Sequence, residues 1–101
     1  MNEQVQPSEI YSIISSNFDL EAKNEITIEE IHRVLTYRIR ELLDKNVERL
    51  VSILYRIDVG QKKTDEIFNN PSKDDIAFLL AEAVIERQLQ KVLSRKKYSS
   101  K

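Results

Sequence analysis

The chain has 101 residues, 41% hydrophobic and 33% charged, and the two kinds are interleaved as in the amphipathic helices of a single domain. One glycine and two prolines are too few turn residues for a β-sandwich or barrel. The absence of cysteine excludes disulfides, thiolate zinc sites and cysteine nucleophiles. The net charge of −1 conceals an asymmetry, because residues 1–86 hold 10 Lys/Arg against 17 Asp/Glu, whereas residues 87–101 hold 6 Lys/Arg and no acid.

Residues 1–26 are predicted to form an N-terminal segment with a short helix. Ser8 is expected to cap this helix, because a serine oxygen can accept a hydrogen bond from a free N–H group of the first turn. The apolar residues are spaced for one helix face: Ile10, Ile13, Ile14 and Phe18. An irregular linker is expected at 19–25. The alternative for the whole segment is an arm that packs on a partner subunit.

Two amphipathic helices are predicted next, at about residues 28–43 and 46–58. Thr27 and Glu30 have the spacing of a capping box, which favours a helix start at this point. The first helix carries apolar residues three and four apart: Ile28, Ile31, Leu35, Ile39 and Leu42. The second helix repeats the pattern: Val47, Leu50, Val51, Leu54 and Ile57. Because the break between them is short, we expect an antiparallel helix hairpin.

A short connecting helix at about 61–69 and a long C-terminal helix at about 73–97 follow. Gly60 is the only glycine and is expected to mark the stop after the hairpin. Pro71 ends the connecting helix, because the residue before a proline disfavours helical geometry. Ser72 then caps the last helix.

The predicted class is therefore all-α, a small bundle of three to four helices in a domain at 27–97, followed by a polar tail at 98–101. The longest apolar run covers only residues 76–80, far short of a membrane span. The polar N-terminus has no signal-peptide pattern. A cytoplasmic protein that does not contact the membrane is expected.

The long helix is apolar on two faces, and both faces need cover. One stripe suits the core of the bundle, and a second lies roughly opposite: Phe78, Ala81, Ile85, Leu89 and Val92. Our favoured hypothesis places a homodimer or another helical protein on this second stripe, since an uncovered apolar stripe promotes aggregation. The alternative is that the N-terminal segment, through Ile10, Ile14 and Phe18, covers it within one chain.

Three polar residues fall on the apolar stripes: His32, Arg38 and Asp58. In an antiparallel hairpin, Asp58 comes opposite His32, which predicts a hydrogen bond that fixes the helix register. A general base with its orienting acid is the less favoured reading, because no nucleophile accompanies the pair. Arg38 is expected to pair with an acid of the last helix, Glu82 or Glu86, and a bound phosphate or carboxylate is the alternative.

Arg87, Lys91 and Arg95 are four residues apart and share one face of the last helix. Such a row could contact a nucleic-acid backbone, where each phosphate contact adds salt-dependent affinity. The alternative is a solvated helix end, because cations near a C-terminus complement the helix dipole. The acidic body of the chain argues against a general nucleic-acid binder.

Residues 54–59 (Leu-Tyr-Arg-Ile-Asp-Val) and 85–91 (Ile-Glu-Arg-Gln-Leu-Gln-Lys) look like a pattern in small uncharacterised bacterial helical proteins. The resemblance covers about residues 28–97 and leaves out the N-terminal segment. It implies a bacterial origin and a compact helical fold, and no activity. Those proteins prefer a polar capping residue after the Asp-Val pair, where this chain has Gly60.

The sequence contains no catalytic, metal or nucleotide motif, and a non-enzymatic function without a cofactor is expected. The leading hypothesis is a protein-interaction module that self-associates through the long C-terminal helix. The second is a nucleic-acid-associated accessory protein that uses the basic helix end. An enzyme with a pocket at the three polar residues is the third.

Overall fold

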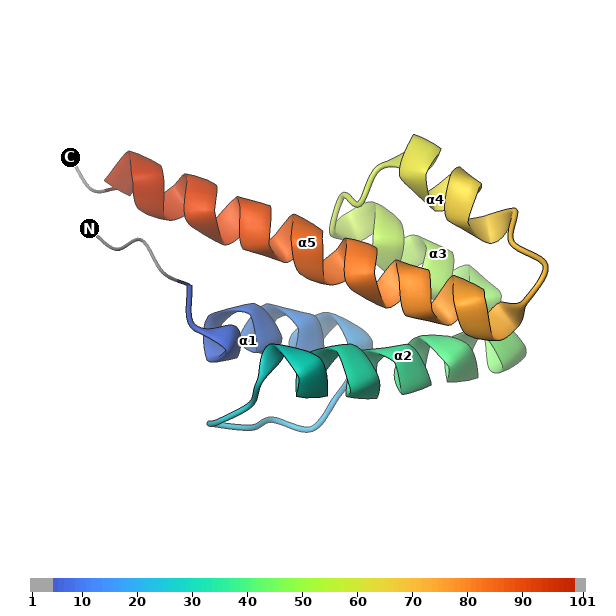
Figure 1. Ribbon diagram of the computed structural model, residues 1–101, viewed down its shortest axis with the longest axis horizontal. Coiled ribbons are helices and arrows are strands. Elements are labelled where there is room, and N and C mark those ends of the chain that lie inside the picture. The colour runs from blue at the N-terminus through green and yellow to red at the C-terminus, as the bar shows by residue number, and fades with distance from the viewer. Residues whose placement is uncertain (1–4, 100–101) are drawn as a thin grey trace.

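The computed structural model describes residues 5–99, with side chains as far as Lys97. This part of the chain folds into five α-helices and has no strand (Figure 1): α1 (Pro7–Phe18), α2 (Ile28–Lys45), α3 (Val47–Arg56), α4 (Gln61–Phe68) and α5 (Lys73–Ser99). The predicted all-α class and the long C-terminal helix are confirmed. Of the predicted polar tail at 98–101, residues 100 and 101 lie outside the described residues, and α5 continues to Ser99.

The start of α1 differs from the prediction. Pro7 is its first residue, a position where the missing N–H of proline removes no helical hydrogen bond. The residue before the helix is Gln6 rather than Ser8, and its N–H donates to the Glu9 carboxylate at 3.1 Å. At the other end, Asp19 adopts a left-handed φ of 60° and ends the helix.

The start of α2 confirms the predicted capping box. The Thr27 hydroxyl accepts a hydrogen bond from the Glu30 N–H at 3.1 Å, and the Glu30 carboxylate accepts one from the Thr27 N–H at 2.9 Å. This backbone hydrogen bond from Thr27 lowers the pKa of Glu30 below its ordinary value. The pair therefore satisfies two donors that the first turn of a helix leaves free.

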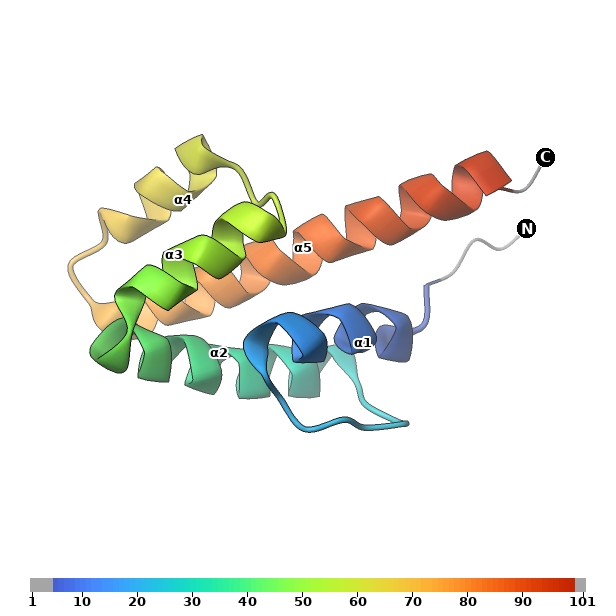
Figure 2. The same cartoon turned by 180° about the vertical axis from the view of Figure 1, so that it is seen from behind.

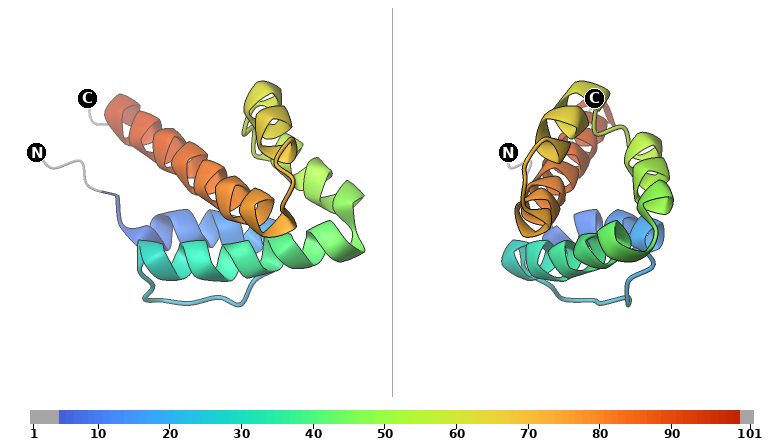
Figure 3. Two further views of the ribbon diagram at one scale, coloured as in Figure 1. Left: turned by 45° about the vertical axis from the view of Figure 1, so that its right-hand side comes forward. Right: turned by 90° about the vertical axis from the view of Figure 1, so that its right-hand side faces the viewer.

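A single residue, Asn46, joins α2 to α3. Its N–H donates to the Leu42 carbonyl at 2.8 Å, and its side-chain oxygen accepts from the Arg49 N–H at 3.1 Å. Asn46 therefore closes one helix and caps the next. Figures 2 and 3 show that α3 turns back from the end of α2 and then diverges from it, so the predicted hairpin is open.

The sequence predicted that Gly60 marks the end of the second helix, and the structure shows otherwise. α3 ends at Arg56, and Asp58 takes up the left-handed conformation after it, with φ 63°. Gly60 has φ 107° and stands directly before α4, where it turns the chain into that helix.

α5 is the central helix of the fold. It lies over α1 and α2 on one side, and α4 packs along it on another (Figures 1 and 3). At about 100° per residue, its buried residues cover more than half of its circumference: Ile76, Ala77, Leu80, Ala81, Ala83, Val84, Ile85, Gln88 and Val92. The fold therefore absorbs much of the apolar excess that the sequence places on this helix.

The core is continuous and includes α1. Its largest fully buried side chains come from four helices: Ile10, Ile14, Phe18, Ile31, Leu35, Ile39, Leu50, Ile53, Leu80 and Val84. Full burial of one such side chain stabilises the fold by about 1.5–3 kcal/mol relative to leaving it exposed. α1 is thus part of the same packed unit as the four helices that follow it.

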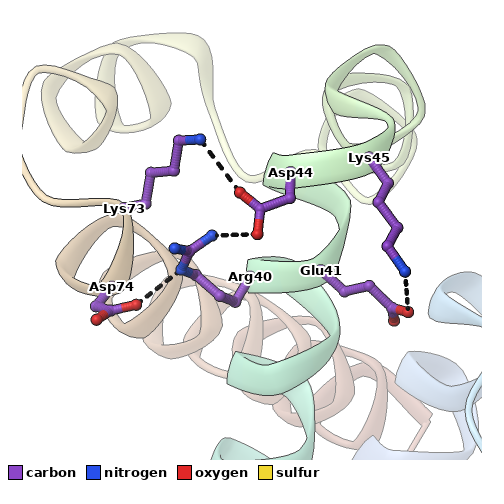
Figure 4. A network of polar contacts seen from close by, with 6 residues as sticks. All are labelled: Arg40, Glu41, Asp44, Lys45, Lys73 and Asp74. Carbon is purple, nitrogen blue, oxygen red and sulfur yellow. Dashed lines mark hydrogen bonds and ion pairs between the residues drawn. The ribbon is translucent and has the colours of Figure 1, made fainter.

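An ion network ties the end of α2 to the start of α5 (Figure 4). Arg40 lies 2.7 Å from both the Asp44 and the Asp74 carboxylates, and Lys73 lies 3.2 Å from Asp44. The hydrogen bond from Arg40, and then the one from Lys73, lower the pKa of Asp44 below its ordinary value. The network is on the surface, so it orients the two helices more than it stabilises them.

Candidate protein-interaction surface

The fold divides the predicted interface of α5 into a covered side and an open side. Ala81, Ile85 and Val92 are buried, with exposed fractions of 0, 9 and 6%. Phe78 and Leu89 are open, with exposed fractions of 49 and 36%. One side of the predicted stripe therefore belongs to the core of the same chain.

α1 and α2 cover the buried side. α1 packs against α5 and buries its own apolar face: Ile10, Tyr11, Ile14 and Phe18. Val92 borders Glu9 and Ile13 of α1 in a depression of about 420 Å³. This arrangement matches the alternative drawn from the sequence, in which the N-terminal segment covers the stripe. The same arrangement does not cover the open side of the stripe.

The open side extends beyond the residues that the sequence singled out. Leu93 is 37% exposed, and Ile28 of α2 is 40% exposed. Ile28 and Phe78 line the same depression, of about 450 Å³. We call the four residues together the α5 edge: Ile28, Phe78, Leu89 and Leu93. Leu93 follows Leu89 by four residues, a spacing that could have identified it. The sequence pattern places Ile28 on the core face of α2.

His32 holds Phe78 in place from the side of α2. The two ring centroids are 4.3 Å apart, with the planes at 71°, an edge-to-face contact. The Nε2 of His32 lies 3.2 Å from the Phe78 carbonyl oxygen, which accepts a hydrogen bond when Nε2 carries the proton. Both contacts fix α2 against α5 at the α5 edge.

The predicted pairing of His32 with Asp58 is wrong. Because α3 diverges from α2, Asp58 is carried to α5, where Arg87 binds it. The Arg87 Nε donates to the Asp58 carbonyl at 2.9 Å, and its Nη2 lies 3.0 Å from the Asp58 carboxylate. Asp58 is exposed, so the residue is a surface anchor for α5 rather than part of a polar core.

Arg38 also has partners other than those predicted. Its Nε donates to the Phe18 carbonyl at 2.9 Å, at the end of α1, and its Nη1 pairs with Glu41 at 2.8 Å. This hydrogen bond and charge lower the pKa of Glu41 below its ordinary value. Glu86, one of the expected acids, lies 3.7 Å from Lys63 instead. Arg38 satisfies a free helix carbonyl, and the three polar residues each have a different partner in the fold.

Two of the three predicted nucleic-acid contacts are used within the chain. Lys91 Nζ donates to the Ile57 carbonyl at 2.8 Å, and Arg87 binds the next carbonyl, that of Asp58. Both carbonyls lie at the C-terminal end of α3, where cations are favourable. Arg95, the third member of the row, is exposed beyond this contact. The row is therefore mainly a clamp between α5 and α3.

The basic end of α5 also contacts α1. Lys96 Nζ lies 3.1 Å from the Glu9 carboxylate. The hydrogen bond from Lys96 is the largest cause that lowers the pKa of Glu9 below its ordinary value, and the charge of Arg95 adds a smaller contribution. The charge asymmetry of the chain is thus partly balanced within the fold.

Another depression, of about 340 Å³, lies between α3 and α4. Its apolar lining is Val51, Leu54, Tyr55 and Phe68. Tyr55 is 65% exposed, so it offers a large apolar side chain on a surface that belongs to α3 and α4 rather than to the α5 edge.

No helix in the described part of the chain is long and apolar enough to cross a membrane. Within residues 5–99, no group of three or more His, Cys, Asp or Glu side chains is placed to hold a metal ion. Comparison of the chain with protein-family models, with curated proteins and with solved structures finds no match. The resemblance to small bacterial helical proteins therefore stays a prediction.

Proposed function

We propose that this chain is a non-enzymatic protein-interaction module that self-associates through the α5 edge. The observation that carries the proposal is the line of open apolar side chains on one helix, Phe78, Leu89 and Leu93, with exposed fractions of 49, 36 and 37%. At about 1.5 Å per residue the line is roughly 23 Å long. The exposed Glu82 and Glu86 interrupt the line, yet three large apolar side chains on one helix face are more than the single ones that are common on surfaces.

The contacts of Phe78 support the proposal. Aromatic side chains are common anchors at interfaces, because they bury a large area for few rotatable bonds. The edge-to-face contact with His32 already holds the Phe78 ring in the free chain. A partner would therefore restrict little further motion of this ring on binding, which lowers the entropic cost of association.

The surroundings of the edge are polar, as at the rim of an interface. Glu29, Glu82 and Glu86 line the depression that Ile28 and Phe78 share. Charged residues around an apolar centre keep the free surface hydrated and exclude water from the centre once a partner is bound. Glu29 borders the edge in this way, whereas Glu82 and Glu86 lie between Phe78 and Leu89 along α5.

Light scattering and sedimentation equilibrium test the proposal. The wild-type protein is expected to reach twice the monomer mass in the micromolar range, and Leu89→Asp is expected to remain a monomer, because a buried unpaired carboxylate opposes association. Tyr55→Asp is the matched control, since it places the same charge on an exposed apolar residue of α3. It is expected to associate like the wild type. Ile85 is a poorer site for the test, because it is only 9% exposed and its replacement disturbs the core.

A wild-type protein that stays monomeric up to its highest attainable concentration contradicts the proposal. Equal loss of association in Leu89→Asp and Tyr55→Asp also contradicts it, because the α5 edge would then have no special part. Circular dichroism of both variants at equal concentration checks that each remains helical.

A further inference from the structure

We infer that the second copy packs on the α5 edge with its α5 antiparallel, in a register set by the opposite charges at the two ends of that helix. The inference rests on the proposed self-association and adds the direction and the register of the two helices. Its basis is the order of exposed residues along the open side of α5.

The open side of α5 changes from acidic to basic along the helix. Asp75, Glu82 and Glu86 are exposed in its first half. At the other end the apolar line is followed by Lys96, which is half-buried and 3.1 Å from the Glu9 carboxylate of α1, and by the exposed Lys97. At about 100° per residue, all five lie within one arc of roughly 100° that also contains the open apolar side chains. The charges therefore flank the apolar line on the face that a partner would cover.

Opposite charges at the two ends favour one direction of pairing. A parallel pair would place acids beside acids and cations beside cations, and like charges brought together oppose association. An antiparallel pair places the acidic end of each copy beside the basic end of the other. Exposed ion pairs add little affinity, so we assign to these charges the choice of direction and register rather than the strength of the dimer.

Overlap of the open apolar residues sets the register. They run from Phe78 to Leu93 on α5, and full overlap of two antiparallel copies places the twofold axis near Ile85 and Glu86. Phe78 then faces Leu93 of the second copy, and Asp75 comes beside the basic end, where Lys96 also binds Glu9 of its own chain. The same register places Glu82 opposite Leu89, whose side chain the methylene groups of the glutamate can cover.

One feature of this register opposes the dimer. Glu86 approaches its equivalent in the second copy near the twofold axis. Each Glu86 carboxylate lies 3.7 Å from Lys63 of its own chain, which offsets this repulsion. Lys63 is on α4, so the contact of α4 with α5 takes part in the proposed interface.

Distances between spin labels on the two copies test the direction and the register. The chain has no cysteine, so Gln90→Cys and Ser94→Cys each give one labelling site. Both residues are neutral and exposed. At about 100° per residue, Gln90 lies next to the arc of the open side and Ser94 about 60° beyond it, so both are outside the proposed contact. Association of the labelled variants is checked by light scattering, so that a loss of the dimer is recognised as such.

The antiparallel register predicts that the two Gln90 labels are offset by about 14 Å along the helix axis and the two Ser94 labels by about 26 Å, since each residue away from the twofold axis adds about 3 Å. A parallel pair predicts nearly equal distances at both sites. A dimer with equal distances overturns the antiparallel register and leaves the proposed self-association standing. A monomeric wild-type protein, or a dimer in which both distances are too long to measure, overturns both. Labelled variants that are monomeric while the wild type is a dimer overturn the register, because both sites would then belong to the contact.

Discussion

The two halves of α5 hold the fold together in different ways. The first half, residues 73–86, packs fully buried small and branched side chains into the core: Ala77, Leu80, Ala81 and Val84. In the second half, as far as Lys97, only Gln88 and Val92 are buried. That half binds its neighbours through charged groups, with Arg87 and Lys91 on the end of α3 and Lys96 on Glu9 of α1. The first half is fixed mainly by packing, with a surface ion network at its start, and the second half mainly by electrostatic contacts.

This difference teaches how to interpret two strong sequence signals. The apolar excess of the first half and the basic row of the second half both predict an external partner when they are considered alone. The fold uses most of each signal internally. The α5 edge is the apolar part of the helix that the core leaves open, with Phe78 in the first half and Leu89 and Leu93 in the second, and it is the part for which a partner is proposed.

The largest expected effect comes from the packed half. Leu80→Ala removes a side chain with an exposed fraction of 0%, and we expect the free energy of unfolding to fall by about 2–5 kcal/mol. The same change at Leu93, which is 37% exposed, is expected to alter it by about 0.5 kcal/mol or less at low protein concentration. Urea denaturation measures both. Similar losses in the two variants would show that the two halves are packed alike.

A smaller effect is expected from the clamp in the second half. Lys91→Ala removes the 2.8 Å hydrogen bond to the Ile57 carbonyl, and we expect a loss of about 1 kcal/mol in the free energy of unfolding. Arg95→Ala is the matched control, because it removes an exposed cation from the same helix face. Its loss is expected to stay below about 0.5 kcal/mol. Thermal denaturation of the two variants decides whether the row is a clamp, and an equal response would contradict that role.

The smallest expected effect is the acid dependence of the ion network at the start of α5. Arg40 lowers the pKa of Asp44 in the folded chain, so the network stabilises the fold above the ordinary aspartate pKa of about 3.9. That contribution is lost as the pH falls through the lowered pKa and Asp44 takes up its proton. Arg40→Gln should make stability less dependent on pH in this range. Urea midpoints recorded from neutral to acidic pH test this, and an unchanged pH profile would count against the network.

Periodicity predicted the helices well, because the spacing of apolar residues directly reflects which face of a helix is buried. The capping box at Thr27 and Glu30 located the start of α2, whereas the Ser8 cap predicted for α1 was wrong. The number of residues that joins two helices does not determine the angle between them. The pairing of His32 with Asp58 failed for this reason, since α3 diverges from α2 after Asn46.

The candidate surface could be predicted only in part. The sequence pattern identified the apolar positions of the stripe on α5. Which of them are covered depends on where α1 packs, and the pattern of a single helix carries no information about that. The partners of Arg38 and Lys91 are backbone carbonyls at helix ends, Phe18 and Ile57. Every residue has a carbonyl, so no sequence pattern marks the one that a distant cation will bind.

The most direct test of the central claim, that copies of this chain meet at the α5 edge, is a dilution series of ¹⁵N NMR spectra of the wild-type protein. We expect the concentration-dependent shifts to cluster at Phe78, Leu89 and Leu93 of α5 and at Ile28 of α2. The residues around Tyr55 on α3 are expected to stay unchanged. Shifts that cluster on α3 and α4 instead, or spectra that do not change with concentration, would contradict the claim.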